Sequence, residues 1–334
     1  MTRTLTRLLA GTAGVAAGAT SLTYVAYRKD IRDARRRVES GRQFLDSPHG
    51  PIEFAEAGDG PAVLFIHGAG GGFDQGLDVG RVFLGDGYRL IAPSRFGYLG
   101  TPVPKDASAE AQADAHRRLL DALHLDRVPV IAISAGAPSA MRLCLDHPDR
   151  CSALVLIVPG AYAPEHVTLP AASSFFQTVL NTIASSDLAF WTATKVTRST
   201  LVKTILGTPI EVYRNATAEQ RRSIDATLLS VLPVSRRVAG ISNDNVVVSG
   251  LSRYPLEEMR VPALVISAAD DLYGTYENGL YTAAHIRDAR FLGFRSGGHL
   301  LVGHDAEVRS QITAFLKASM VAEALATTAS SSAI

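Results

Sequence analysis

The stretch that decides the fold is Val130-Ile131-Ala132-Ile133-Ser134-Ala135-Gly136, an apolar run that ends in a serine among small residues. A helix-like segment follows at once over residues 137–147. A strand that turns sharply into a helix at one serine pushes that hydroxyl out of the sheet edge, and the tight turn requires small neighbours. The stretch matches the nucleophile-elbow pattern G-x-S-x-G, with Ala132 in place of the first glycine. It predicts that Ser134 is a nucleophile, and a simple turn serine is the alternative.

A serine hydroxyl is a weak nucleophile, so it needs a base, and the base needs an acid to orient it. Both residue types follow in the chain order Ser, Asp, His. The apolar run 263–267 reads as a buried strand and leads into Asp270-Asp271. Residues 289–294 read as the next strand and lead through a glycine-containing turn to His299. Because ligands bind at the carboxyl ends of strands in such sheets, we expect these groups to share one site with the serine.

A glycine-rich loop, His67-Gly68-Ala69-Gly70-Gly71-Gly72, follows the short apolar run 62–66. Backbone N–H groups of such a loop can point at an oxygen on which negative charge develops. The N–H of Ala135 is the second donor expected there. The loop lacks the Gly-Lys-Ser/Thr ending of a phosphate-binding loop and the spacing of a dinucleotide fingerprint, so we do not expect nucleotide binding. His67 is interpreted as a structural histidine that supports the loop.

From about Gly50 to about Ala318 the chain resembles the α/β-hydrolase superfamily. The resemblance rests on four features in the expected order and spacing: the His67-Gly68 loop, the Ser134 elbow, the Asp pair at a strand end, and Gly298-His299. It implies a serine-dependent active site on a sheet whose loops carry all the reacting groups.

The resemblance implies a catalytic triad of Ser134, His299 and Asp271, and an oxyanion hole from the N–H groups of Ala69 and Ala135. The acid and the first donor each have an alternative, Asp270 for the acid and Gly70 for the donor. We favour Asp271 because the Thr275-Tyr276-Glu277 segment is closer to the family's usual continuation. The other aspartate would then be a turn residue or a helix cap.

Apolar strand patterns alternate with helical patterns along most of the chain, which predicts an α/β fold. We expect the α/β-hydrolase fold: a mainly parallel sheet of the eight-stranded type, helices on both faces, and an inserted helical cap. The predicted divisions are an apolar N-terminal segment (1–27), a basic and helical linker (28–47), the hydrolase core (48–159 and 256–319), the helical cap (160–255) and a disordered tail (320–334).

Strand alternation stops between residues 160 and 255, where helix-like stretches follow one another at 172–184, 188–206 and 217–232. In this superfamily an insertion at this place is a lid over the active site. The aromatic residues of this region are expected to form an apolar roof or the core of the cap itself: Phe175, Phe176, Phe190, Trp191 and Tyr213. The side chains expected to contact substrate are Arg95, Phe96 and Trp191.

The run Leu8 to Tyr27 contains 20 residues without a charge. It is long enough to cross a bilayer core of about 30 Å. Basic residues follow it between positions 28 and 37, which favours a cytoplasmic carboxyl side. We therefore expect a transmembrane helix through residues 8–27 that binds the membrane and a cytoplasmic catalytic domain. A cleaved signal peptide on a secreted protein and a soluble chain with an amphipathic or disordered leader are the alternatives.

Composition excludes several classes of protein. Hydrophobic residues make up 47% of the chain and charged residues 19%, enough for a sizeable core. The net charge of +1 gives no electrostatic case for a nucleic-acid partner. Cys144 and Cys151 form no metal motif and do not indicate a disulfide scaffold. No metal or other cofactor is expected.

These features predict a serine hydrolase that cleaves a carboxylic ester or related carbonyl compound of apolar or aromatic character. The small-molecule substrate would form an acyl-enzyme on Ser134. Carbon–carbon bond hydrolysis and acyl transfer on the same triad are alternatives, the former because the Asp270-Asp271 segment looks like that of ring-cleavage-product hydrolases. A non-catalytic binding protein on the same scaffold is the alternative from another class.

Overall fold

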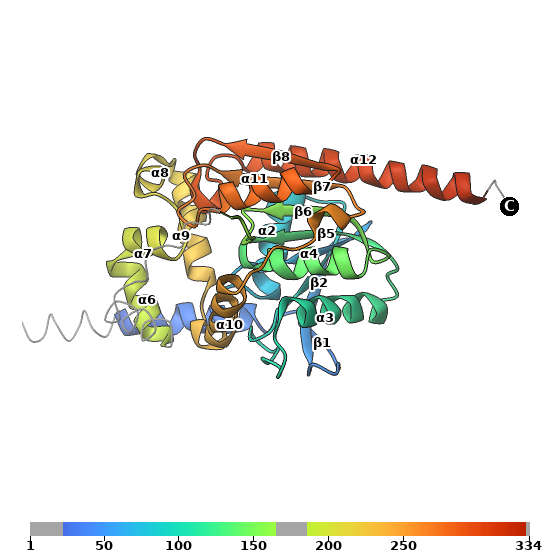
Figure 1. Cartoon of the computed structure of the whole chain (residues 1–334). Coiled ribbons are helices and arrows are strands. Elements are labelled where there is room, and N and C mark those ends of the chain that lie inside the picture. Colours follow the sequence, from blue (N-terminus) through green and yellow to red (C-terminus); the bar gives the residue numbers. More distant parts are fainter. Residues whose placement is uncertain (1–22, 165–185, 332–334) are drawn as a thin grey trace, which may run out of the picture.

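An eight-stranded sheet forms the centre of the computed structural model, which describes residues 23–164 and 186–331 (Figure 1). The strand order is β1-β2-β4-β3-β5-β6-β7-β8. β2 runs antiparallel to β1 and β4, and the other neighbours are parallel. The predicted α/β fold with a mainly parallel sheet is confirmed. The strands are β1 (Gln43–Leu45), β2 (Ile52–Ala57), β3 (Ala62–Ile66), β4 (Arg89–Pro93), β5 (Val128–Ile133), β6 (Cys151–Ile157), β7 (Ala263–Ala268) and β8 (Ala289–Phe294).

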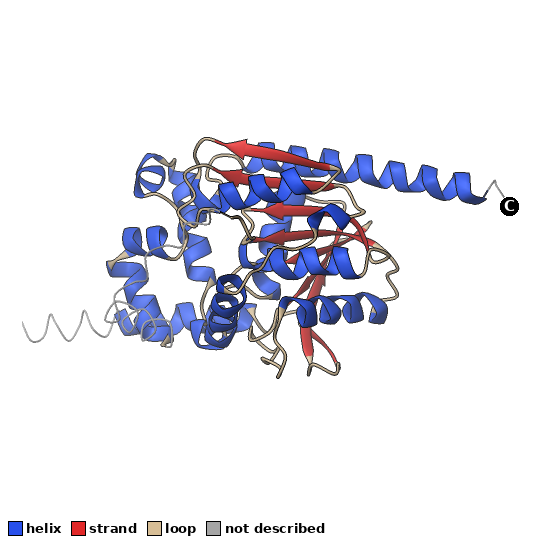
Figure 2. Ribbon diagram, in the orientation of Figure 1, coloured by secondary structure: helices blue, strands red, loops and turns tan. Residues whose placement is uncertain are grey.

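Helices cover both faces of this sheet (Figure 2). On one face lie α3 (Ala109–Ala122), α4 (Ala137–Asp146) and α11 (Thr275–His285), and on the other lie α2 (Phe73–Leu84) and α12 (Asp305–Ser331). Successive side chains of a strand point to opposite faces. In β5, Val130 and Ala132 therefore join one apolar cluster, and Ile131 joins the other. This burial on both faces explains why the central strands are continuous apolar runs.

The order of the strands brings together the loops that carry the predicted site residues, which follow β3, β5, β7 and β8. β5 pairs with β3 on one side and with β6 on the other, so the loops after β3 and β5 leave the same edge of the sheet from adjacent positions. β7 follows β6 in the sheet and β8 follows β7, all parallel. The segments after β7 and β8 therefore leave that edge too.

The described part of the cap is a group of short helices beside the sheet edge (Figure 1). They are α6 (Asp187–Val196), α7 (Arg198–Thr204), α8 (Ile210–Asn215), α9 (Ala218–Ser230) and α10 (Val238–Ser249). α9 begins at a capping box formed by Thr217 and Gln220. The cap has its own apolar cluster, which includes Phe190, Trp191 and Leu228. The expected helix 172–184, with Phe175 and Phe176, lies outside the described residues.

The prediction of a transmembrane helix is corrected by the structure. Across residues 23–164 and 186–331, none of the helices is both long and apolar enough to span a membrane. Residues 8–22 of the expected span lie outside the described residues. The remainder, 23–27, begins a helix that continues to residue 37 and buries Ile31 and Ala34 against the cap cluster. That part of the expected span therefore belongs to a helix that packs on the protein.

Two other expected segments also differ from prediction. In the region predicted as a basic and helical linker, residues 28–37 are helical as expected, but β1 then follows and pairs with β2. The tail predicted to be disordered from residue 320 is helical up to Ser331, as a continuation of α12 (Figure 1). Its alanine-rich composition is compatible with helix, because alanine has the highest helix propensity.

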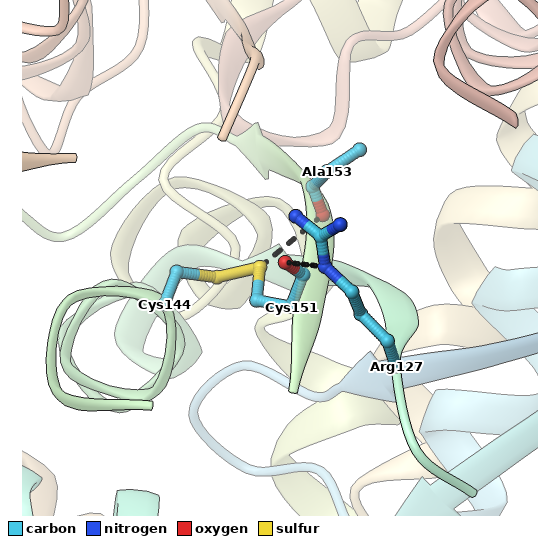
Figure 3. Close-up of a disulfide and its surroundings, with 4 residues drawn as sticks. All are labelled: Arg127, Cys144, Cys151 and Ala153. Carbon is cyan, nitrogen blue, oxygen red and sulfur yellow. Dashed lines mark hydrogen bonds between the residues drawn. A yellow bond between two sulfur atoms is a disulfide. The ribbon is translucent and has the colours of Figure 1, made fainter. Parts of the chain in front are cut away.

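Cys144 and Cys151 form a disulfide, which the sequence did not predict (Figure 3). Their Cα atoms are 5.2 Å apart, and both residues are fully buried. Cys144 lies in the last turns of α4 and Cys151 opens β6, so the bond closes the connection between helix and strand. Arg127 donates a hydrogen bond from Nε to the Cys151 carbonyl at 3.0 Å. The spacing of seven residues gave no pairing signal, because the turn between them decides whether the sulfurs meet.

Candidate active site

Ser134 sits in a strained turn between β5 and α4. Its φ of +53° is in the left-handed region, which costs a non-glycine residue energy and persists at functional sites. A short 3-10 turn, η1 (Ser134–Gly136), links the strand to the helix. A Cβ at position 136 would come within 2.6 Å of the His67 carbonyl oxygen, which explains the glycine there. The β3 loop passes just as close to the serine, since a Cβ on Gly68 would lie 3.2 Å from Ser134 Cβ.

His299 lies between Ser134 and Asp271. Its Nε2 is 2.9 Å from Ser134 Oγ, and its Nδ1 is 2.7 Å from Asp271 Oδ2. An ionised carboxylate only accepts hydrogen bonds, so this contact assigns the ring proton to Nδ1. Nε2 is then the acceptor for the serine hydroxyl proton. Asp271 and His299 are buried, while Ser134 is half-buried.

Asp271 is held in its ionised form. Burial raises the pKa of its carboxyl, but the adjacent His299 ring, which donates to it, lowers that pKa, together with the hydrogen bonds from the Thr275 hydroxyl and the Tyr273 N–H. The net effect places the pKa of Asp271 below its usual value. Ser267 Oγ lies 2.9 Å from Thr275 Oγ1 and extends this network into β7.

The alternative acid, Asp270, contacts the backbone in place of the histidine ring. Its two carboxylate oxygens accept hydrogen bonds from the N–H groups of Gly297 at 3.2 Å and Gly298 at 2.8 Å. These glycines immediately precede His299, and both have positive φ. The structure therefore brings Asp271 to the imidazole and assigns Asp270 to the loop that carries it.

The two candidate donors in the glycine-rich loop, the N–H groups of Ala69 and Gly70, differ in whether they already donate a hydrogen bond. Gly70 donates its N–H to Tyr98 Oη at 3.2 Å, so it is already engaged. Among the backbone hydrogen bonds of the described residues, none is donated by the N–H of Ala69 or of Ala135. This pattern favours Ala69 over Gly70 as the partner of Ala135.

His67 holds the beginning of that loop. Its Nδ1 lies 2.7 Å from the Gly68 carbonyl oxygen and donates to it, while Nε2 accepts the N–H of Arg95 at 2.9 Å. Complete burial and the nearby Arg95 charge hold the pKa of His67 well below its usual value. The ring is neutral and has a supporting role, as the sequence indicated.

The three side chains expected to contact substrate are engaged elsewhere. Arg95 forms a buried ion pair with Asp244 of the cap. Phe96 is buried with Ile52 and residues of α3 in a separate apolar cluster. Trp191 packs in the cap core and donates from Nε1 to Asp30 at 2.8 Å. The expectation of substrate contact is therefore corrected: each residue stabilises packing between segments that the sequence could not place.

A cap loop also reaches the segments that carry Asp271 and His299. The Gly207 carbonyl accepts hydrogen bonds from the N–H of Leu272 at 3.0 Å and of His299 at 3.4 Å. The Tyr273 hydroxyl is directed at the carbonyls of Thr204 and Ile205, at 3.1 and 2.9 Å. The Tyr273 ring meets the His299 ring edge-on, with centroids 4.8 Å apart. One cap carbonyl thus joins the acid-bearing loop to the base-bearing loop.

A family model described as the alpha/beta hydrolase fold matches residues 61–305 of this chain. The chain belongs to the α/β-hydrolase family. This confirms the predicted family and the prediction of an α/β-hydrolase enzyme, and it agrees with the strand order and with the position of Ser134 after β5.

Individual relatives of this α/β-hydrolase agree with the assignment. An uncharacterized hydrolase of Bacillus subtilis, YcgS, is 25% identical over 302 residues, covering 85% of this chain and 99% of that protein. The 2-hydroxy-6-oxo-6-phenylhexa-2,4-dienoate hydrolase of Comamonas testosteroni is 30% identical over 121 residues, or 34% of this chain and 42% of that enzyme. An α/β-hydrolase fold protein from Nakamurella multipartita has a solved structure with a TM-score of 0.68 and 26% identity, covering 83% and 99% of the two chains.

Sequence reasoning missed three contributors to the site of this α/β-hydrolase. Gly207 and Tyr273 form the contact between a cap loop and the core. The place where a cap loop packs on the core cannot be read from periodicity in the sequence. The only signal was the Gly207-Thr208-Pro209 turn within the helical region. The loop-holding role of Asp270 was hidden because both aspartates lie at the same strand end.

Proposed function

We propose that this α/β-hydrolase is a serine hydrolase that cleaves carboxylic esters through an acyl-enzyme on Ser134. The observation that carries the proposal is the line of contacts from Ser134 Oγ through the His299 ring to Asp271 Oδ2. Geometry of this kind supports nucleophilic attack by a serine whose base is oriented by a buried acid.

The reaction follows from the roles of these groups. His299 Nε2 takes the proton of Ser134 Oγ as the oxygen attacks the ester carbonyl carbon. The N–H groups of Ala69 and Ala135 stabilise the oxyanion. The imidazolium then gives its proton to the leaving alcohol as the ester C–O bond breaks. Water, deprotonated by the same nitrogen, attacks the acyl-enzyme, and His299 Nε2 returns that proton to Ser134 Oγ as the acyl C–O bond breaks and the acid leaves.

An apolar acyl group is supported by Val231 of the cap, which lies beside Gly70 of the glycine-rich loop. The two methyl groups of Val231 lie 3.6 and 3.7 Å from the point that a Cβ on Gly70 would occupy. The Val231 side chain is a hydrocarbon, so it favours an apolar acyl substituent over a charged one at that place.

Mass spectrometry of the protein quenched during turnover tests the proposal. We expect p-nitrophenyl esters of acetate, butyrate and benzoate to add one acyl group to the peptide that contains Ser134. Ser134→Ala should show no adduct and no hydrolysis above the buffer rate. Turnover without an adduct, retained in Ser134→Ala, would refute the acyl-enzyme.

Carbon–carbon bond hydrolysis is a second candidate, favoured by the 30% identity to the Comamonas testosteroni hydrolase named above. That likeness covers 34% of this chain, so it supports the reaction class less directly than the site geometry supports serine chemistry. The two candidates are distinguished by comparing kcat/KM for a p-nitrophenyl ester with that for a 2-hydroxy-6-oxo-dienoate. A ratio in favour of the dienoate would select the second candidate.

A further inference from the structure

Asp244, in the cap helix α10, organises two core residues that hold the glycine-rich loop. Arg95 places Nη1 and Nη2 at 2.5 and 2.7 Å from the two Asp244 oxygens, and both side chains are 6% exposed. Arg95 Nε donates to the His67 carbonyl at 2.9 Å. Tyr98 donates its hydroxyl to Asp244 at 2.5 Å and accepts the Gly70 N–H. Asp244 thus fixes the side chains of Arg95 and Tyr98, and each of these forms a hydrogen bond with the backbone of the loop.

The phenol of Tyr98 keeps its proton in this arrangement. Burial, followed by the Asp244 charge, raises the pKa of Tyr98 well above its usual value. The hydroxyl therefore donates to the carboxylate and leaves its lone pairs for the Gly70 N–H. The direction of both hydrogen bonds is set by Asp244.

Arg237, just before α10, holds the other end of the same loop. Its side chain is completely buried and donates from Nη1 to the Gly71 carbonyl. Nη2 is 2.8 Å from Oδ2 of Asp74, which lies in the first turn of α2. Arg37 of the 23–37 helix adds a second cation at 3.0 Å from the same carboxylate. The pKa of Asp74, which burial raises, is lowered overall by these two arginines.

The two ion pairs are reciprocal. In one, a core arginine meets a cap aspartate, and in the other, a cap arginine meets a core aspartate. Together they restrain the His67 carbonyl, the Gly70 N–H and the Gly71 carbonyl, which lie on both sides of Ala69 in the chain. Burying such pairs is a poor source of stability, because desolvation offsets the attraction. Their burial beside the loop is better explained if they hold the loop backbone in place.

We propose that Asp244 and Arg237 are positioning residues, through which the cap fixes the glycine-rich loop so that the Ala69 N–H is aimed at the substrate oxygen. This inference rests on the proposed function, because it assumes an oxyanion at Ser134. Donors that are fixed before reaction are worth far more than donors that must reorganise. The cap would then contribute to the chemical step itself, in addition to any role in covering the substrate.

The test compares Asp244→Asn and Arg237→Lys with Arg198→Met. The control breaks a cap ion pair, Arg198 with Asp225 at 2.6 Å, that contacts neither the loop nor Ser134. We expect the two positioning variants to lose about tenfold to 100-fold in kcat with little change in KM, a partial form of the loss from deleting an oxyanion donor. We expect the control to keep the wild-type kcat.

Two further readouts separate positioning from general destabilisation. An alkylboronic acid forms a tetrahedral adduct on a catalytic serine, so its affinity should fall by the same factor as kcat. Hydrogen exchange of the peptide covering residues 67–72 should become faster in the positioning variants and stay unchanged in the control. Tyr98→Phe keeps the ring and removes the contacts to Gly70 and Asp244, so it provides the same test if a charge variant fails to fold.

Wild-type kcat and boronate affinity in folded Asp244→Asn, Arg237→Lys and Tyr98→Phe would overturn the inference. An equal loss in Arg198→Met would also overturn it, because the effect would then be general weakening of the cap. Failure of the proposed function is a separate outcome, visible in the wild type as the absence of any acyl adduct.

Discussion

Asp270 and Asp271 are adjacent in the chain, and each carboxylate accepts hydrogen bonds from a different part of the segment that carries His299. Asp271 receives Nδ1 of the His299 ring, while Asp270 receives the N–H groups of Gly297 and Gly298. Asp271 thus orients the imidazole, and Asp270 holds the backbone that immediately precedes His299. A strand end with two acids therefore supplies two separate constraints on one base.

This division predicts unequal effects of two matched substitutions. In Asp271→Asn the amide can favour the wrong ring tautomer, so we expect kcat to fall by about 10⁴, the size of loss seen for the acid of a serine triad. In Asp270→Asn one acceptor oxygen remains for the glycine N–H groups, so we expect a loss of about tenfold. Asp270→Ala should be worse than Asp270→Asn. Steady-state kinetics on a p-nitrophenyl ester decides the matter, and a larger loss in Asp270→Asn than in Asp271→Asn would reverse the assignment.

Gly207 is predicted to be required for alignment of the base. Its φ is +52°, and a Cβ there would lie 2.6 Å from the Tyr273 ring and 3.0 Å from His299 Cβ. We expect Gly207→Ala to reduce kcat at least tenfold by displacing these groups. Gly41→Ala is the matched control, because Gly41 has φ +70° with nothing within 4 Å of the added methyl. Both variants carry the left-handed penalty of about 1 kcal/mol, so only the clash distinguishes them. Equal activity of the two variants would argue against the contact.

Two buried histidines predict that the protein loses stability in mild acid. Burial lowers the pKa of His116 to about 3 and, with the Arg95 charge, holds the pKa of His67 well below its usual value. The unfolded chain therefore binds protons that the folded chain does not, and stability that is present above about pH 6.5 is lost as the pH falls. Each histidine contributes a slope of up to about 1.4 kcal/mol per pH unit.

Urea unfolding between pH 6 and pH 5 measures this slope. We expect His116→Gln to remove about 1.2 kcal/mol per pH unit from it over this range, whatever the substitution does to stability at pH 8. The slope is the decisive quantity, since a lost contact alone shifts the whole profile by a constant. An identical slope in wild type and His116→Gln would contradict the prediction.

The disulfide is predicted to be a structural crosslink. For a closed loop of this length, chain entropy gives a stabilisation of about 2.5 kcal/mol. We expect the Cys144→Ala/Cys151→Ala double variant to lose about that free energy of unfolding with its activity retained. Thiol titration of the denatured, unreduced wild type checks the premise. Two free thiols per chain would show that the bond does not form in the protein as isolated.

Residues near one another in sequence were predicted well, and contacts between distant segments were not. The run that ends at Ser134 defines its own strand, turn and helix, because periodicity, small residues and a short connection all act locally. The strand ends before Asp271 and His299 were found in the same way. Arg95 and Trp191 were misassigned because their partners, Asp244 and Asp30, lie about 150 residues away in the chain. No local pattern records such a pairing.

The most direct test of the central claim is labelling of the purified protein with a fluorophosphonate, which reacts with activated serines. Wild type, Ser134→Ala, His299→Ala and the Gly41→Ala control are compared at equal folded concentration. We predict one equivalent of label on wild type and on Gly41→Ala, with none on the other two. Labelling that persists in Ser134→Ala, or a folded wild type that takes no label from the smallest probe, would contradict a serine nucleophile activated by His299.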